Sequence, residues 1–97
     1  MYYVYMLTNQ NNTVLYTGMT NDILTRIHEH KLGNHKGFSK KYNCTKLVWF
    51  SRFSTAIDAI AFEKKLKKWK REYKENLIDE LNADWKDLAE NILLNVR

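Results

Sequence analysis

Side chains that can activate water, hold a cation and offset negative charge are spread over the first two thirds of the chain. Tyr5 and Tyr16 lie in two apolar segments, Arg26 and His30 follow four positions apart, and Glu63 comes later. Attack on a phosphodiester needs a group that activates water, cations that offset charge on the phosphoryl oxygens, and usually a metal ion held by a carboxylate. Together the five residues predict metal-assisted cutting of a phosphodiester.

Taken singly, each of these side chains also has an ordinary structural interpretation. Strand tyrosines are often core residues with a hydrogen-bonded hydroxyl, and spacing alone favours that interpretation for Tyr5 and Tyr16. Arg26 and His30 border the apolar stripe of a helix, where a solvated arginine and a packed histidine are common. Glu63 precedes a run of lysines and could form a salt bridge. The order and joint spacing of the five residues favour a common site.

The acidic side chains restrict the kind of metal site. Residues 1–78 contain six of them: Asp22, Glu29, Asp58, Glu63, Glu72 and Glu75. A two-metal nuclease site needs several acids together, so one metal ion held by the single carboxylate of Glu63 fits better. One cysteine and three histidines cannot make the usual structural zinc site. A tyrosine, whose reference pKa is about 10, would need nearby cations to act as a base.

Three segments have the aromatic and β-branched composition of strands. Residues 2–7 and 13–19 flank a polar turn at 9–12 and predict a β-hairpin, and residues 47–53 predict a third strand. The expected fold is α+β: a small antiparallel, three-stranded sheet flanked by helices, with a C-terminal helical extension.

Two main helices are expected around this sheet. The first runs from Asp22 to Leu32, with Gly33 as its stop. After a capping-box pattern at 55–58, helical spacing predicts one long helix. Its packed face is formed by residues three and four apart: Ala59, Phe62, Leu66, Trp69, Tyr73 and Leu77. Residues 33–45 lack periodicity and predict a mobile basic loop.

A chain of 97 residues is expected to form a single domain. Residues 1–81 form its body, and residues 82–97 form a short acidic helical extension of the same domain. The apolar positions of that extension recur at helical spacing: Trp85, Leu88, Ile92 and Val96. The single cysteine and the lack of an export signal or a long apolar run predict a cytoplasmic protein without a membrane anchor.

Charge is distributed unevenly along the chain. Residues 1–78 carry fourteen Lys or Arg against six Asp or Glu, and residues 79–97 carry two against five. A small basic body attracts polyanions, of which nucleic acid is the commonest, although membrane headgroups and acidic proteins also fit. The opposite charges would also let the tail of one copy dock on the body of another, as a homodimer.

Two basic segments, residues 33–45 and residues 64–74, supply the predicted nucleic-acid contacts. The run from Lys64 to Lys74 has seven basic residues in eleven positions with two aromatic residues interleaved, which suits phosphate contacts and base stacking. A solvated helix face with buried aromatic residues is the alternative. The predicted contacts in the two segments are Lys40, Lys41, Tyr42, Lys64, Lys67, Lys68, Lys70 and Arg71.

Two short motifs give this pattern a family resemblance. Tyr3-Val4-Tyr5 and Tyr16-Thr17-Gly18, separated by ten residues, resemble the two motifs that name the GIY-YIG nuclease superfamily. The helix that carries Arg26 and His30, and then Glu63, follow in the order and at the spacing of that superfamily. The similarity covers most of the chain and is particularly close to the small single-domain bacterial members, the UPF0213 group.

The resemblance implies roles for the five residues. It implies that Tyr5 or Tyr16 activates water, with the choice between them open. It also implies that Arg26 steadies the scissile phosphate, that His30 assists proton transfer or orientation, and that Glu63 binds Mg²⁺ or Mn²⁺.

Further residues follow from the same resemblance. The backbone at Gly18 would allow nucleic acid to approach the site closely, and Asn76 would occupy the place of a polar residue that some members use. Tyr3 replaces a glycine of the first motif and Thr17 an isoleucine of the second. These two departures bear on substrate fit, because neither removes a reactive side chain.

The first functional hypothesis is a divalent-metal-dependent DNA endonuclease that acts on branched, nicked or damaged DNA in repair or recombination. The alternative is a nucleic-acid-binding module that keeps the fold but cuts weakly or not at all. A third hypothesis is an interaction protein whose acidic tail binds a partner copy. Sequence specificity is not expected, because no zinc finger or helix-turn-helix accompanies the body.

Overall fold

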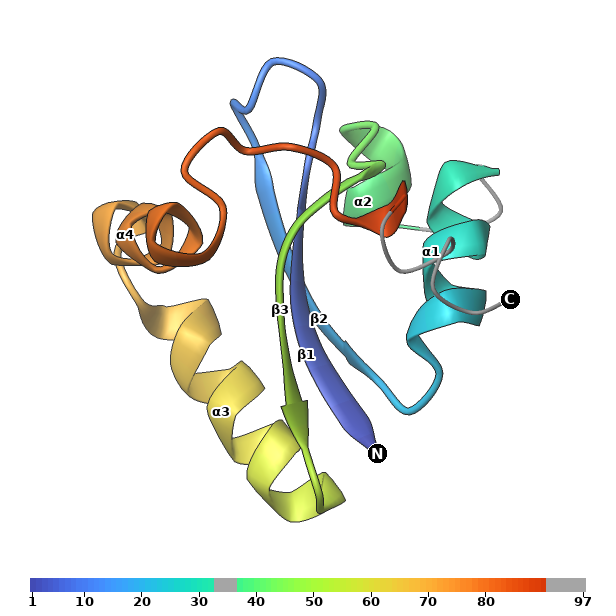
Figure 1. Cartoon of the computed structure of the whole chain (residues 1–97), viewed down its shortest axis with the longest axis vertical. Coiled ribbons are helices and arrows are strands. Elements are labelled where there is room, and N and C mark those ends of the chain that lie inside the picture. The colour runs from blue at the N-terminus through green and yellow to red at the C-terminus, as the bar shows by residue number, and fades with distance from the viewer. Residues whose placement is uncertain (33–36, 91–97) are drawn as a thin grey trace.

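The computed structural model of the chain, which describes residues 1–32 and 37–90, contains a three-stranded antiparallel sheet. β1 (Tyr2–Thr8) is central, and β2 (Leu15–Thr20) and β3 (Lys46–Phe53) lie on either side of it (Figure 1). The predicted α+β fold, with its hairpin and third strand, is confirmed.

A polar side chain fixes the turn between β1 and β2. Asn9 Oδ1 accepts hydrogen bonds from the backbone N–H groups of Thr13 at 2.8 Å and Val14 at 3.1 Å, and Asn9 Nδ2 donates to Thr13 Oγ1 at 2.7 Å. Asparagine commonly closes turns in this way. The resulting register places Tyr5 opposite Gly18.

The helices of the described residues are α1 (Ile23–Lys31), α2 (Phe38–Lys41), α3 (Ala56–Lys68) and α4 (Arg71–Leu81). α1 begins after Asp22, whose carboxylate accepts a hydrogen bond from the backbone N–H of Thr25 at 3.1 Å, a typical N-cap. It lies within the predicted helix, whose expected stop, Gly33, is outside the described residues.

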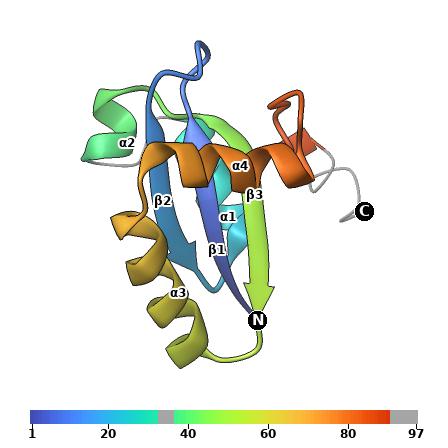
Figure 2. The same cartoon turned by 90° about the vertical axis from the view of Figure 1, so that its left-hand side faces the viewer.

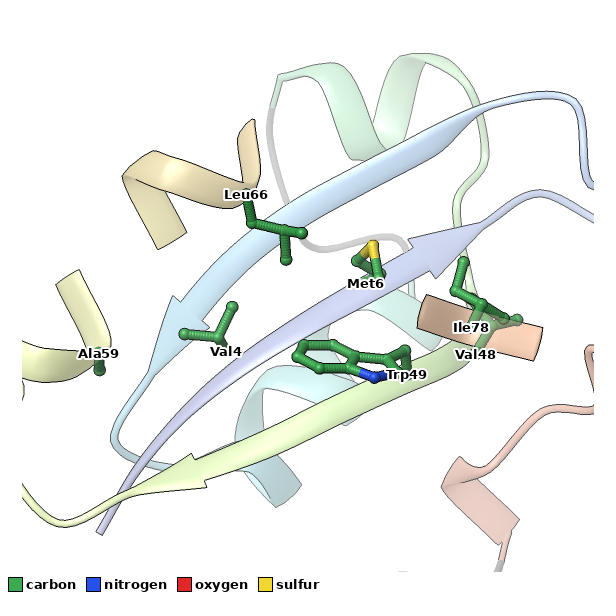
Figure 3. Packing of buried hydrophobic residues seen from close by; sticks show 7 residues of the cluster. All are labelled: Val4, Met6, Val48, Trp49, Ala59, Leu66 and Ile78. Atoms are coloured by element: carbon green, nitrogen blue, oxygen red, sulfur yellow. The ribbon is translucent and has the colours of Figure 1, made fainter. Parts of the chain in front are cut away.

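Alternation of side chains along the strands gives the sheet two apolar faces. Tyr5 and Leu7 point to the face covered by α1. Val4 and Met6 point to the opposite face, which α3 and α4 cover. Figure 3 shows the buried cluster on that second face, formed by Val4, Met6, Val48, Trp49, Ala59, Leu66 and Ile78. The sheet therefore separates two small cores.

The predicted single long helix is wrong, because the segment forms two helices. Trp69 and Lys70 have extended backbone (φ −66°, ψ 146° and φ −64°, ψ 151°), so α3 ends there and α4 continues across the sheet in a new direction (Figure 2). A straight helix would run past the sheet, whereas two crossing helices each bury an apolar stripe on it. As a result Ile78 is fully buried, and Tyr73, expected on the packed face, is 52% exposed.

Arg71 fixes the start of α4 against the hairpin. Its two terminal nitrogens donate to the backbone carbonyls of Asn12 and Thr13, both at 2.7 Å, and its Nε donates to Glu75 at 2.6 Å. All three guanidinium nitrogens thus have partners inside the domain. We assign Arg71 a structural role and leave it out of the nucleic-acid interface that the sequence predicted.

The loop predicted for residues 33–45 is partly wrong as well. Phe38–Lys41 forms the short helix α2, and Cys44 is fully buried in the core on the α1 side of the sheet. Residues 33–36 lie outside the described residues. The cysteine of this segment therefore has a packing role in the core.

The segment after α4 is bound to β3. The side chain of Asp87 accepts hydrogen bonds from the backbone N–H of Leu47 at 3.1 Å and from Lys31, and the backbone N–H of Leu88 donates to the carbonyl of Leu47 at 2.7 Å. Asn82 Nδ2 donates to the carbonyl of Val48 at 3.1 Å. The segment is thus joined to the body through the outer edge of β3.

The helix predicted from Trp85 onward begins later than expected. Trp85 has a φ of 54°, which no helix accommodates, and helical backbone appears only at residues 89–90. Ile92 and Val96 lie outside the described residues. Over residues 1–32 and 37–90, no helix is long and apolar enough to span a membrane.

Candidate active site

Three aromatic rings from β1, β2 and α1 meet on the α1 face of the sheet. The ring centroids of Tyr5 and Tyr16 are 6.3 Å apart, those of Tyr5 and His30 are 6.0 Å apart, and those of Tyr16 and His30 are 5.8 Å apart. We call these three residues the tyrosine–histidine cluster. Tyr5 is 1% and His30 3% exposed, whereas Tyr16 is half-buried. Within the cluster Tyr16 is therefore the side chain that solvent reaches most easily.

Gly18 makes room for this cluster. A Cβ atom at Gly18 would lie 2.5 Å from the hydroxyl oxygen of Tyr5 and 2.6 Å from its Cζ. The missing side chain lets the phenol ring of the neighbouring strand lie directly over the backbone of β2. The sequence assigned Gly18 to nucleic-acid approach, but in the structure its place is filled by Tyr5.

Arg26 and Glu63 reach the cluster from two helices. α1 carries Arg26, and α3, on the other side of the sheet, packs against β2 and carries Glu63 (Figure 1). The Arg26 side chain is 34% exposed and its Nε lies 3.7 Å from a carboxylate oxygen of Glu29. The Glu63 side chain is 19% exposed and lies 3.7 Å from Lys67 Nζ. Both charged groups therefore face partly toward solvent.

The charges of Arg26 and Glu63 act on both tyrosine hydroxyls. Burial raises the pKa of Tyr5, and Tyr16 and Glu63 raise it further, while Arg26 opposes them. Burial also raises the pKa of Tyr16, and Glu63 adds to this, while Arg26 and a hydrogen bond with Tyr5 lower it. Arg26 and Glu63 thus act on both tyrosine hydroxyls through their charges, while His30 is in ring contact with both tyrosines.

Glu63 supplies a single carboxylate to this site. In residues 1–32 and 37–90 no three His, Cys, Asp or Glu side chains gather in a way that could enclose a metal ion. Mg²⁺ commonly keeps several waters and binds through one or two carboxylates together with substrate phosphates. A single partly exposed glutamate is compatible with that kind of binding.

The lysines predicted to contact nucleic acid remain at the surface. Lys40 and Lys41 lie in the last turn of α2, and Lys41 Nζ lies 5.5 Å from the ring centroid of the exposed Tyr42. Lys64, Lys67, Lys68 and Lys70 are exposed along α3 and its junction with α4. These positions leave the ammonium groups available to a polyanion.

Asn76 does not join the tyrosine–histidine cluster. It lies on α4 and lines a cleft between α3 and α4, together with Trp69 and Tyr73. The sequence predicts these two aromatic residues only as possible stacking groups within a basic run. Their convergence depends on the break between α3 and α4, which no glycine or proline marks.

The fold and this arrangement of residues define the class of the protein. Residues 1–76 match the family described as the GIY-YIG catalytic domain. The solution NMR structure of the UPF0213 protein BH0048 from Bacillus halodurans has a TM-score of 0.57 to this chain at 27% identity, and the match covers 90% of this chain and 93% of that one. The resemblance inferred from the sequence motifs is confirmed.

Relatives of similar length place the chain within that class. It is 33% identical over 79 residues to the UPF0213 protein of Haloquadratum walsbyi, covering 81% of this chain and 88% of that protein. It is 30% identical over 91 residues to the UPF0213 protein of Fusobacterium nucleatum, covering 94% and 89%. The chain belongs to the UPF0213 family and carries a GIY-YIG catalytic domain.

Proposed function

We propose that this protein is a divalent-metal-dependent DNA endonuclease. The observation that supports it best is the meeting of Tyr5, Tyr16 and His30 at a point where Arg26 and Glu63 both act on the tyrosine hydroxyls. These side chains are the base, cation and metal ligand that phosphodiester hydrolysis requires. Branched, nicked or damaged DNA is the substrate class that we propose.

Metal binding would rest on Glu63. Its carboxylate would hold Mg²⁺ or Mn²⁺, which polarises the phosphoryl oxygens and offsets their developing charge. The remaining positions around the ion would be filled by water and by the substrate. Lys67, at 3.7 Å from the carboxylate, would move toward a phosphate when the cation replaces it.

Tyr16 is the better candidate for the group that takes a proton from water, because it is half-buried while Tyr5 is closed off from solvent. A water oxygen attacks phosphorus, its proton passes to the phenolate oxygen of deprotonated Tyr16, and the bond from phosphorus to the leaving oxygen breaks. The leaving oxygen then takes up a proton. Arg26 lowers the pKa of Tyr16, and a hydrogen bond with Tyr5 acts in the same direction.

His30 and Arg26 would serve this step in different ways. The buried ring of His30 packs against both tyrosine rings and would hold them in the orientation that the attack needs. The guanidinium of Arg26 presents a fork of donors that matches two phosphoryl oxygens. Its partial exposure leaves it accessible to a bound strand.

Cutting should become faster with rising pH if Tyr16 is the base. Its pKa is raised above the ordinary value of about 10, so the reactive phenolate gains about tenfold for each pH unit below that pKa. Single-turnover rates at saturating Mg²⁺ should therefore rise with a slope near one between about pH 6 and 9, without a plateau. Tyr16→Phe should remove this slope. A plateau near pH 7 in the wild type would rule out Tyr16 as the base.

Incubation with labelled DNA tests the proposed activity. Duplex, single-stranded, nicked, flap and four-way-junction substrates are each combined with Mg²⁺, Mn²⁺ or EDTA. Cutting in the presence of either ion and its loss in EDTA are the expected results. Binding to all substrates without cutting under any condition would favour the binding module instead.

A further inference from the structure

A cleft of about 560 Å³ lies in the angle between α3 and α4. Its lining includes the aromatic rings of Trp69 and Tyr73, the apolar side chain of Leu77, and the lysines Lys68 and Lys70. None of its lining residues belongs to the tyrosine–histidine cluster. It is therefore a second site candidate, apart from the proposed cutting chemistry.

The aromatic residues of this cleft differ from ordinary core aromatics. Trp69 is held in place by Phe62, whose ring centroid is 6.3 Å away at an interplanar angle of 71°. Tyr73 is 52% exposed although its helix packs on the sheet. One ring is thus fixed by the core and the other is available for contact, as in a platform on which a flat ring can stack.

The polar groups that line the cleft are of two kinds, cationic groups and hydrogen-bonding groups without positive charge. Lys68 and Lys70 place two ammonium groups beside the aromatic rings, and Asn76 and Glu80 contribute an amide and a carboxylate. Ammonium groups attract phosphate. The carboxylate repels phosphate, and both the amide and the carboxylate can hydrogen-bond the edge of a base. This division fits a nucleotide whose base enters the cleft and whose phosphate stays at the lysines.

We propose that the cleft binds an unpaired nucleobase of a DNA strand, stacked on Trp69 and Tyr73, with the adjoining phosphate at Lys68 and Lys70. This inference rests on the proposed function, because it takes DNA as the ligand. It deepens that function by naming the substrate class: DNA with a single-stranded segment, such as a flap or overhang, next to the duplex.

The position of the cleft relative to Glu63 suits one continuous strand. Lys68 follows Glu63 by five residues on α3, which is about 7.5 Å along a helix that rises 1.5 Å per residue. Because five residues also turn about 140° around the helix, a strand bound at Glu63 would pass around α3 to reach the cleft, a path of a few nucleotides. A fully paired duplex has no free base to place there, so the cleft distinguishes the two forms of DNA.

Binding in EDTA, where no cutting occurs, tests the cleft directly. Fluorescence anisotropy is measured with a labelled duplex, with the same duplex carrying a single-stranded flap, and with a flap whose nucleotides are abasic. Tyr73→Ala should weaken flap binding by about 5- to 150-fold, the range found when a stacking residue is replaced by alanine. Duplex binding should not change. The abasic flap should bind wild type and variant equally.

Two further variants control for folding and for helix position. Tyr73→Phe keeps the ring and should bind the flap as the wild type does. Leu81→Ala alters another residue of α4, 54% exposed and outside the cleft, and should change neither affinity. Two results in Tyr73→Ala would overturn the proposal. One is an equal loss of affinity for the duplex and for the flap substrate, and the other is an unchanged affinity for the flap substrate.

Two more measurements distinguish this proposal from a dimer interface and from the proposed nuclease activity. If sedimentation shows a dimer that Tyr73→Ala dissociates, the cleft is an interface between copies and the nucleobase proposal is wrong. Cutting in Mg²⁺ is assayed separately. Tyr73-dependent flap binding without any cutting would reject the nuclease and keep the cleft, whereas metal-dependent cutting with no effect of Tyr73→Ala would reject the cleft and keep the nuclease.

Discussion

Glu63→Gln is expected to lower metal-dependent cutting by about 10³-fold or more, since loss of the metal's charge stabilisation removes several kcal/mol from the transition state. The glutamine is isosteric and neutral, and Glu63 is partly exposed with one ion pair to Lys67. Such exposed pairs contribute little to stability. The variant should therefore fold normally and retain most of its DNA binding.

Calorimetric titration with Mn²⁺ gives this prediction a readout besides cutting. The heat of Mn²⁺ binding should be lost in Glu63→Gln and kept in Glu72→Gln, which changes an exposed glutamate in the first turn of α4. Full metal affinity together with normal cutting in Glu63→Gln would sink the assignment of Glu63 as the metal ligand.

Gly18→Ala is expected to damage both the fold and the site. The new Cβ would lie 2.5 Å from the Tyr5 hydroxyl, and that ring is buried against Tyr16 and His30. Forcing a methyl group into a packed region typically costs about 1–3 kcal/mol. For a domain of this size that corresponds to a fall in Tm of about 4–8 °C per kcal/mol. Displacement of the ring by about 1 Å should also slow cutting about 10²-fold.

A second substitution separates the two effects. Tyr5→Leu removes the atoms that the alanine would meet, so the double variant should recover much of the Tm that Gly18→Ala loses. It should not recover cutting, because the Tyr5 hydroxyl is absent. Thermal melting and single-turnover rates are measured on the wild type, the two single variants and the double variant, which together form a double-mutant cycle. A wild-type Tm and rate in Gly18→Ala would contradict the close approach of the two strands.

Local patterns were sufficient to predict the sheet and the members of the candidate site. Strand composition, the polar turn at residues 9–12 and the cap at Asp22 act over a few residues, so they can be read along the chain. The five site residues were found because their types and order match a known family. Their common electrostatic environment became visible only with the fold.

Features that depend on distant contacts could not be predicted. The helix breaks at Trp69 and Lys70 because α3 and α4 must both cover a short sheet. No glycine or proline in the sequence indicates this break. Arg71 looked like part of a basic run, but its partners at Asn12 and Thr13 are 59 and 58 residues away in sequence. The steric role of a glycine likewise depends on which residue the register places opposite it.

The bonds between residues 82–88 and β3 also affect how the chain can fold during synthesis. Asp87 pairs with the backbone of Leu47 from 40 residues further along the chain. At about 5–20 residues per second, the ribosome makes the edge strand about 2–8 s before its covering segment. During that interval the outer edge of β3 is open to strands of neighbouring nascent chains. Once made, residues 82–88 occupy the backbone groups of Leu47 and Val48 at the start of this edge, which are then closed to such pairing.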